Sequence, residues 1–236
     1  MTSRKHMNIL HIETATDICS VAISSSKELL DARQSTSRNS HAEVLTTLIQ
    51  QSLETVALKA TDLDAIAVSS GPGSYTGLRI GLSTAKGLCY ALGLPLIGIP
   101  TLDALARAAI AVHEDADAYY LPMIDARRME VYTAVYSASM EPVEPVQSHI
   151  FSESSFEHLL SAGRSLVLLG NGALKSHGLL SDKAVTYLDI TCDAPHLVAP
   201  ATLRYEQRLF DDVAYFAPTY HKSPNITVSK KRPLGV

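Results

Sequence analysis

The chain has 236 residues, of which 46% are apolar and 19% are charged, and its formal net charge is −4. These values are ordinary for a soluble globular protein of one large domain or two small ones. Three distant cysteines without a CxxC pair exclude a disulfide framework and a zinc knuckle. The start of the chain lacks a signal-peptide core, and the longest apolar run, residues 88–99, is too short for a membrane span. We therefore expect a cytoplasmic protein without membrane contact.

Basic residues are concentrated at the C-terminal end of the sequence. Residues 221–236 hold Lys222, Lys230, Lys231 and Arg232 and no acidic residue, so the remaining chain is more acidic than the net charge indicates. Because affinity for phosphates comes largely from Lys and Arg, we expect residues 1–220 to bind nucleic acid poorly by themselves. We expect residues 218–236 to form a flexible basic tail, and contact of this tail with RNA is the alternative.

The first half of the chain reads as three strands followed by alternating helices and strands. The first helix is expected to begin with a capping box of Ser40 and Glu43, and Gly93 followed by Pro95 is expected to end the second. The expected elements are strands at 9–12, 20–26 and 28–34, a helix at 41–57, a strand at 65–69, a helix at 77–92, a strand at 96–99 and a helix at 102–112. Their order is β-β-β-α-β-α-β-α.

The second half repeats this order after the acidic residues 113–117. Its expected elements are strands at 119–124, 129–136 and 146–151, a helix at 153–160, a strand at 165–169, a short helix after Gly172, a weak strand at 185–188 and a helix at 198–211. Two such units predict a duplicated α/β fold of the actin/Hsp70/sugar-kinase type, with ribonuclease H-like lobes and a reduced second lobe. We place the N-terminal lobe at 7–102 and the smaller C-terminal lobe at 103–217.

The most informative stretch is residues 71–82, GPGSYTGLRIGL. Two glycines around a proline, between a strand and a helix, indicate either an anion site at the helix N-terminus or a tight connection. The stretch is not a P-loop, because no Gly-Lys-Ser/Thr follows. The helix is apolar on nearly all sides and has small residues at Gly77, Gly81 and Ala85. This pattern predicts that another backbone packs closely against the helix and that one side faces a partner protein.

Proteins of the actin/Hsp70/sugar-kinase type bind nucleotide between their lobes, in part through a hairpin after the first strand. Here that hairpin reads Glu13-Thr14-Ala15-Thr16-Asp17 and contains no glycine. We therefore expect no cofactor, and residual binding of ADP or ATP stays open.

Five segments match the bacterial TsaB family in order and spacing. They are Ile12–Thr16, Ser20–Ile23, Ser40–Glu43, Gly71–Gly81 and Ile124–Arg128, and the chain resembles this family over nearly all residues up to 135. The motif residues are Glu13, Thr14, His41, Gly71, Gly73, Ser74, Thr76, Gly77, Arg79, Gly81, Asp125, Arg127 and Arg128.

The resemblance implies a non-catalytic subunit of the machinery that makes N6-threonylcarbamoyladenosine beside the anticodon of tRNA. Such a subunit binds TsaD, which transfers the threonylcarbamoyl group, and with it the ATPase TsaE. Alone it would form a homodimer, and it would reach tRNA only through the complex. In this family the two N-terminal-lobe helices make the contact with TsaD. The residues expected there are Val44, Leu48, Arg79, Ser83, Lys86 and Tyr90. A bulky acid at Lys86 or Gly81 is expected to abolish the complex without unfolding the chain.

The alternative is an enzyme, either a glycoprotease-like metal hydrolase or an ATP-dependent phosphotransferase. A metal hydrolase would need two histidines one helical turn apart, whereas His41 stands alone and is expected to be a surface residue or minor cap. Ser74 lies one position too early for a Gly-x-Ser-x-Gly motif. Asp125, Arg127 and Arg128 indicate either a charged hairpin with a structural or inter-lobe role, or a contact with tRNA or a partner.

Overall fold

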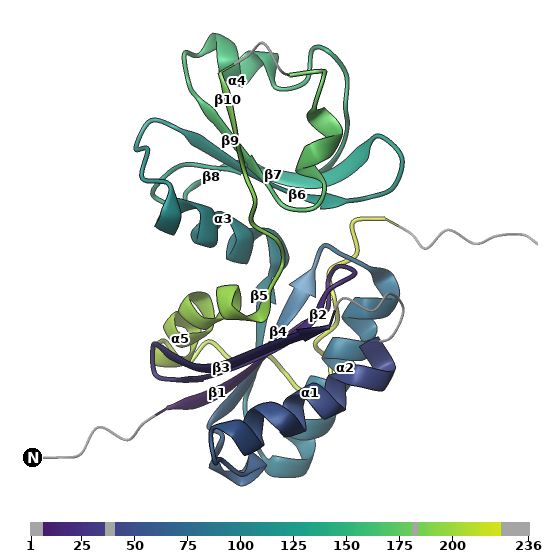
Figure 1. Cartoon of the computed structure of the whole chain (residues 1–236), viewed down its shortest axis with the longest axis vertical. Coiled ribbons are helices and arrows are strands. Elements are labelled where there is room, and N and C mark those ends of the chain that lie inside the picture. Colours follow the sequence, from purple (N-terminus) through teal and green to yellow (C-terminus); the bar gives the residue numbers. More distant parts are fainter. Residues whose placement is uncertain (1–6, 36–40, 181–183, 223–236) are drawn as a thin grey trace, which may run out of the picture.

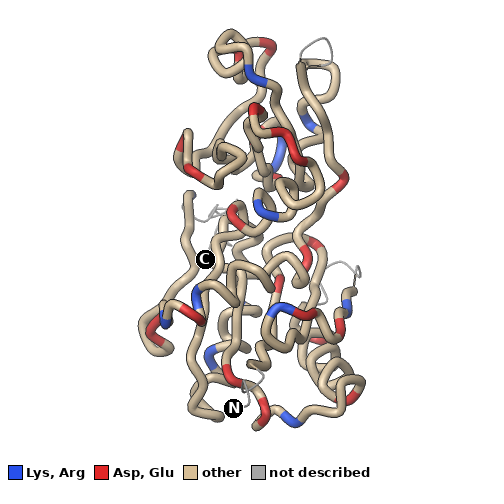
Figure 2. The backbone as a smooth tube through the Cα atoms, turned by 90° about the vertical axis from the view of Figure 1, so that its left-hand side faces the viewer, with Lys and Arg blue, Asp and Glu red and all other residues tan. Residues whose placement is uncertain are grey.

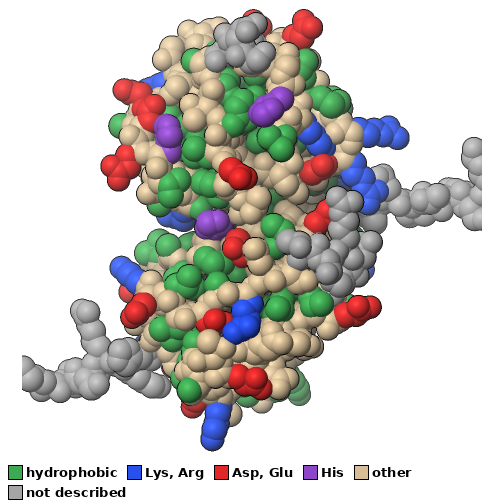
Figure 3. Space-filling model, in the orientation of Figure 1, with side chains coloured by type: hydrophobic (Ala, Val, Ile, Leu, Met, Phe, Trp, Pro, Cys, Tyr) green, Lys and Arg blue, Asp and Glu red, His purple; other side chains and the backbone are tan. Residues whose placement is uncertain are grey.

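A computed structural model describes residues 7–35, 41–180 and 184–222 of the chain. Two five-stranded sheets form two lobes, one above the other in Figure 1. The N-terminal lobe lies below, and the space-filling view narrows to a waist between the lobes (Figure 3). Both lobes place helices against a sheet, which buries the apolar faces of both.

The first sheet has the strand order β3-β2-β1-β4-β5. Its strands are β1 (Asn8–Glu13), β2 (Cys19–Ser25), β3 (Glu28–Ser35), β4 (Ala65–Gly71) and β5 (Leu96–Pro100). The first three are antiparallel neighbours, whereas β4 and β5 run parallel to β1. Two helices cover one face, α1 (His41–Thr55) and α2 (Tyr75–Leu92), and α5 (Val198–Glu206) covers the other (Figure 1). A 3-10 turn, η1 (Ala60–Asp62), precedes β4.

The second sheet has the strand order β10-β9-β6-β7-β8. Read from the other end, β8-β7-β6-β9-β10, it corresponds strand by strand to the first sheet. Its strands are β6 (Tyr119–Asp125), β7 (Glu130–Tyr136), β8 (Pro142–Ile150), β9 (Leu166–Leu169) and β10 (Val185–Leu188). The helix α3 (Thr101–Val112) connects the sheets, and α4 (Glu157–Ser161) and the 3-10 turn η2 (Ala173–Ser176) are short. The same strand order in both sheets confirms the predicted duplicated α/β fold with a reduced second lobe.

Alternation along β1 sends its side chains into two separate cores. Leu10 and Ile12 pack in the cluster beneath α1 and α2, and Ile9 packs in the cluster beneath α5. By the same alternation His11 points toward α5, where its Nε2 atom lies 2.8 Å from Ser24 Oγ. Burial lowers the pKa of His11 to about 3, so the ring stays neutral at physiological pH.

The last helix packs on the first lobe, although we predicted that residues 103–217 belong to the second. The 3-10 turn η3 (Ala194–Leu197) and α5 contribute Leu197 and Ala201 to the core that contains Ile9 and Ile97. Without this cover, one whole apolar face of the first sheet would be exposed to water. The division of the chain at residue 102 itself stays a prediction.

Residues 211–222, which we call the strap, run beside α2 from the first sheet toward the second. In Figure 1 they form the yellow end of the described chain. The Asp211 N–H donates to the Leu96 carbonyl at 2.9 Å and so closes the free edge of β5. Farther along, the Thr219 N–H donates to the Ser70 carbonyl at 2.9 Å. The strap therefore runs alongside α2 and the edge of the first sheet.

The strap is anchored in its middle and at its far end. Phe216 packs against the core beneath α1 and α2, and its ring fills the space that a side chain on Gly98 would need. At the far end, Lys222 forms an ion pair with Glu130 of β7. The strap thus joins the two lobes.

The turn between β4 and α2 packs against the loop after β1, and we call this contact the hairpin–helix junction. The Ser74 N–H donates to the Ala15 carbonyl at 2.6 Å, and the Ser74 hydroxyl caps the helix by accepting from the Gly77 N–H at 3.2 Å. A Cβ atom on Gly77 would overlap the Thr14 carbonyl oxygen, and one on Gly81 would overlap the Thr14 hydroxyl. The small residues admit a backbone, as predicted, but that backbone belongs to the same chain.

Two sequence predictions fall at least partly on residues that the structure does not describe. The capping residue Ser40 lies outside the described residues, and so does the basic tail beyond Lys222. Within 7–35, 41–180 and 184–222, no helix is both long enough and apolar enough to cross a membrane.

We expect Gly77→Ala to lower the free energy of unfolding by about 1–3 kcal/mol, because the added methyl group meets the backbone of Thr14. The matched control is Gly87→Ala on the same helix, where a Cβ atom has open space. This control should gain up to about 1 kcal/mol from helix propensity. Urea denaturation of both variants measures the difference, and equal effects would contradict the close packing at the junction.

Candidate functional site

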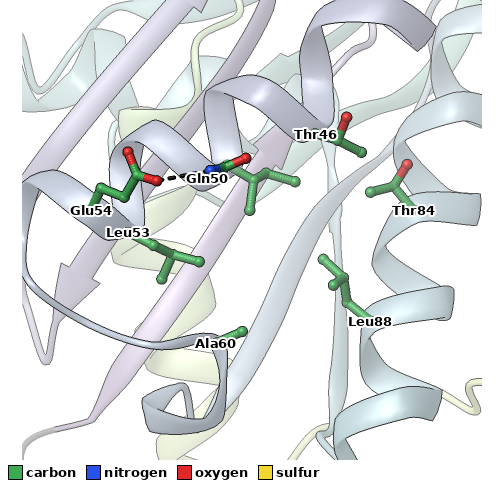
Figure 4. A pocket seen from close by; sticks show the side chains of 8 residues that line it. Thr46, Gln50, Leu53, Glu54, Ala60, Thr84 and Leu88 are labelled. Atoms are coloured by element: carbon green, nitrogen blue, oxygen red, sulfur yellow. Dashed lines mark hydrogen bonds between the residues drawn. The ribbon is translucent and has the colours of Figure 1, made fainter.

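The outer surface of α1 and α2 carries an apolar groove (Figure 4). The two helices pack side by side, and the groove between them encloses a cavity of about 270 Å³. At its rim Gln50 Nε2 donates to Glu54 Oε1 at 2.8 Å. The residues that line the groove are Thr46, Ile49, Gln50, Leu53, Glu54, Ala60, Thr84 and Leu88. Two ridges flanking an apolar groove form a surface that suits the side chains of another helix.

On its outward side, α2 presents a row of exposed residues. Ser83, Gly87 and Tyr90 follow one another at helical spacing, and 87% of the Tyr90 surface is accessible. We use the term α1–α2 face for the groove together with these three residues. Tyrosine is enriched in protein contacts, which makes Tyr90 a candidate contact residue.

Two of the predicted contact residues, Ser83 and Tyr90, lie on the α1–α2 face. Val44 and Leu48 are half-buried and pack against the core beneath the helices, and neither lines the groove. Helical spacing puts them on the flank of α1 opposite Thr46. Their contact with a partner stays a prediction.

The other two predicted contact residues, Arg79 and Lys86, hold the strap. Lys86 Nζ donates to the carbonyls of Ala214 and Phe216 at 2.9 and 3.0 Å. Arg79 Nε donates to the Tyr220 hydroxyl at 3.1 Å. Both cationic side chains therefore have a role inside the chain.

These positions change what the predicted substitutions would do. A bulky acid at Gly81 would clash with the side chain of Thr14, so we now expect it to destabilise the fold as well as the complex. An acid at Lys86 would lose both hydrogen bonds to the strap. Neither substitution separates partner binding from folding.

The motif residues of the first lobe meet at the hairpin–helix junction. Gly71 has φ of +104°, which side chains rarely tolerate, and a Cβ atom on Gly73 would overlap Ala15. Thr76 is exposed in the first turn of α2. The N–H groups of Ser74 and Gly77 are already bonded within the chain. The stretch thus forms a tight connection, and the anion site stays a prediction.

Glu13 ends β1 with a buried carboxyl group. It is 1% exposed, and its Oε1 atom accepts from the Ala15 N–H at 2.6 Å. Burial raises the pKa of Glu13 to about 7, although hydrogen bonds from Ala15 and Ser69 oppose the shift, and the charge of Asp193 adds to it.

His41 is buried, whereas we predicted a surface residue or a minor cap. Its Nε2 atom lies 2.9 Å from the Thr16 carbonyl oxygen, so it ties the start of α1 to the loop after β1. Among the described residues no group of three or more His, Cys, Asp and Glu side chains is arranged to hold a metal ion.

Two histidines contact serines, but neither serine is accessible. His11 lies 2.8 Å from Ser24 and His149 lies 2.9 Å from Ser155. Ser24 is fully buried and Ser155 is 3% exposed. A substrate cannot reach either hydroxyl, so both pairs stabilise the fold.

Asp125, Arg127 and Arg128 lie at the turn between β6 and β7. Asp125 Oδ1 accepts from the Arg127 N–H at 2.5 Å and forms an ion pair with Lys175 at 2.5 Å. The two arginines have φ of 73° and 52°, and both are exposed. The carboxylate therefore shapes the turn, while the two guanidinium groups face the solvent. Both predicted roles of this motif stay open.

Several residues of the α1–α2 face were missed in the sequence analysis. Thr46, Gln50, Thr84 and Leu88 line the groove, yet none stood out as a motif. A helical wheel places Thr46 and Gln50 on one flank of α1, but only the packing of α1 beside α2 identifies which flank meets the neighbour.

We expect Glu13→Gln to become more stable relative to the unsubstituted chain as the pH rises from about 5 to 8. The folded carboxyl has a pKa near 7 and the unfolded one near 4.5, so the folded state binds the extra proton and loses stability as it ionises. The relative gain is at most about 3 kcal/mol.

Urea denaturation of both proteins at several pH values measures this gain. His11 titrates in part of the same range, but its contribution is common to both proteins and cancels in the difference. A stability difference that does not vary with pH would show that Glu13 ionises normally.

Comparison with protein families matches residues 34–155, just over half of the chain, to TsaD, tRNA N6-adenosine threonylcarbamoyltransferase. The chain is also similar to the tRNA threonylcarbamoyladenosine biosynthesis protein TsaB of Escherichia coli. The two are 33% identical over 169 residues, which cover 70% of this chain and 72% of the relative.

Solved structures extend the likeness to most of the fold. YeaZ from Pseudomonas aeruginosa covers 91% of this chain and 99% of its own at 24% identity, with a TM-score of 0.74. An activator of the 2-hydroxyisocaproyl-CoA dehydratase from Clostridium difficile, solved with bound ADPNP, covers 86% of this chain and 98% of its own at 9% identity, with a TM-score of 0.52. Both likenesses concern the fold, which is that of the actin/Hsp70/sugar-kinase type. The match of residues 34–155 to TsaD and the similarity to the Escherichia coli protein together establish the family of this chain. It belongs to the TsaB family of tRNA threonylcarbamoyladenosine biosynthesis proteins.

Proposed function

We propose that this chain is a non-catalytic subunit in the biosynthesis of tRNA threonylcarbamoyladenosine, and that its α1–α2 face binds TsaD. The observation that carries the proposal is the groove between α1 and α2, together with the exposed Tyr90 on α2, on helices whose position the hairpin–helix junction fixes. An apolar groove on a rigid support is suited to a protein partner rather than to a small polar substrate.

The relation to TsaD supports a particular geometry. The matched segment, residues 34–155, contains both α1 and α2. Two related lobes that carry the same pair of helices can pack about an approximate twofold axis, so that each pair lies across the other. Without TsaD, a second copy of this chain would offer the same pair, which is our reason to propose a homodimer in its absence.

The chemistry of the described residues supports a subunit without its own reaction. The serine hydroxyls that contact histidine are buried, and His41 is bonded to the Thr16 carbonyl. The buried Glu13 stands where a nucleotide-binding hairpin would need backbone donors for phosphate. We therefore propose that the chain uses no nucleotide and no metal ion.

We further propose that TsaE joins the pair of this chain with TsaD and that tRNA is bound by the complex. The chain has a net charge of −4, and Figure 2 shows Lys and Arg scattered among Asp and Glu over both lobes. Such a surface offers no continuous basic stripe on the described chain for the phosphates of tRNA.

We expect Thr46→Arg to weaken binding to TsaD of the same organism by at least about tenfold, because it places a charge in the apolar groove. Thr46 is exposed, so the fold should be retained. The matched control is Thr186→Arg, at an exposed position of β10 in the second lobe. Light scattering after size exclusion, on each variant alone and mixed with TsaD, measures the complex.

The unsubstituted chain should form a stable heterodimer, and Thr186→Arg should form it equally well. Absence of a heterodimer at micromolar concentrations would contradict the proposal. Hydrolysis of ATP by the isolated chain would favour the competing function, an enzyme of the phosphotransferase or hydrolase type.

A further inference from the structure

The strap carries an aromatic side chain that lies almost entirely in solvent. Tyr215 is 87% exposed, as is Tyr90, and no other large apolar or aromatic side chain of the described residues is more exposed. Tyr215 lies between Ala214 and Phe216, whose carbonyls accept from Lys86 Nζ. Lys86 precedes Tyr90 by one helical turn. The two most exposed tyrosines therefore lie next to the same lysine, one on the strap and one on α2.

The backbone that presents Tyr215 is held by five hydrogen bonds and one apolar anchor. Asp212 Oδ1 accepts from the N–H groups of Ala214 and Tyr215 at 2.7 and 2.9 Å, and its carbonyl accepts from the Phe216 N–H at 2.8 Å. Lys86 Nζ donates to the carbonyls on both sides of Tyr215, that of Ala214 at 2.9 Å and that of Phe216 at 3.0 Å, which makes five. The Phe216 ring is inserted toward the core. A turn held this firmly loses little backbone entropy when its exposed side chain is buried by a partner.

We infer that the strap is a third element of the TsaD-binding face, in which Tyr215 and Tyr90 act as aromatic anchors on both sides of Lys86. This inference rests on the proposed function, because it extends the α1–α2 face across α2 to the strap. The ammonium group of Lys86 is already bonded to two carbonyls, so it needs no acidic partner. The partner surface that fits is apolar, with hydrogen-bond acceptors within reach of the two phenolic hydroxyls.

The proposed occupant is TsaD because the patch is continuous with the α1–α2 face. Tyr90 belongs to that face, and Tyr215 adjoins it through Lys86. A TsaD lobe that lays its own helix pair across α1 and α2 would also cover the adjacent strap. A second copy of this chain is the competing occupant, and the test separates the two.

The test measures the dissociation constant for TsaD with the full-length variants Tyr215→Ala, Tyr90→Ala and Tyr215→Phe. The control is Ile150→Ala, which shortens a side chain that is 68% exposed on β8 of the second lobe. We expect both alanine variants to bind about tenfold more weakly or worse, Tyr215→Phe to keep most of the affinity, and the control to bind normally. Melting temperatures should stay unchanged, since both tyrosines are exposed.

The outcomes distinguish this inference from the proposed function. Weaker binding by Tyr90→Ala with normal binding by Tyr215→Ala would overturn the role of the strap and leave the α1–α2 face in place. Normal binding by both variants would overturn this inference and leave the groove to the Thr46→Arg test, whereas no binding of TsaD by the unsubstituted chain would overturn the proposed function as well. If Tyr215→Ala weakened only the association of two copies of this chain, the occupant would be a second copy and not TsaD.

Discussion

The rest of the structure depends on the close approach of α2 to the loop after β1. Gly77 and Gly81 have no side chain, so Thr14 lies directly against the helix. The same loop holds the start of α1 through His41, and α2 in turn holds the strap through Lys86. All three elements that we assign to partner binding are therefore positioned from one loop. A rigid support of this kind keeps the groove and the exposed tyrosines in place before a partner arrives.

On our proposal, the same loop suits this lobe to partner binding rather than to phosphate chemistry. The fold is shared with a dehydratase activator that was solved with a bound nucleotide analogue, and that likeness concerns the fold alone. Here the end of β1 carries Glu13, whose carboxyl group is buried and whose pKa is raised to about 7. The second lobe contributes few elements beyond its sheet, and the strap fastens it to the first through Lys222 and Glu130. We therefore interpret the fold of this chain as a scaffold that presents partner-binding surfaces.

Much of the fold could be predicted from the sequence, because hydrophobic periodicity and turn residues are local signals. The repeated order of elements indicated the duplicated lobes correctly. The predictions that failed concern features that depend on contacts between residues distant in the sequence. The helix predicted at 153–160 starts later, since Phe156 takes a positive φ of 59°, and α5 packs on the first sheet because that face needs cover. The glycines of α2 indicated that another backbone segment packs closely against this helix. The sequence does not show whether that segment belongs to the same chain or to a partner. The role of Lys86 and the exposure of Tyr215 depend on a strap whose course follows from tertiary packing alone.

Amide hydrogen exchange on this chain, with and without TsaD of the same organism, tests the central claim most directly. The claim that the first lobe binds TsaD through α1, α2 and the strap predicts slower exchange in residues 41–55, 75–92 and 211–220 of the complex. The strands of the second sheet should exchange as they do in the free chain. Protection confined to β6–β10, or no change at saturating TsaD, would contradict the account.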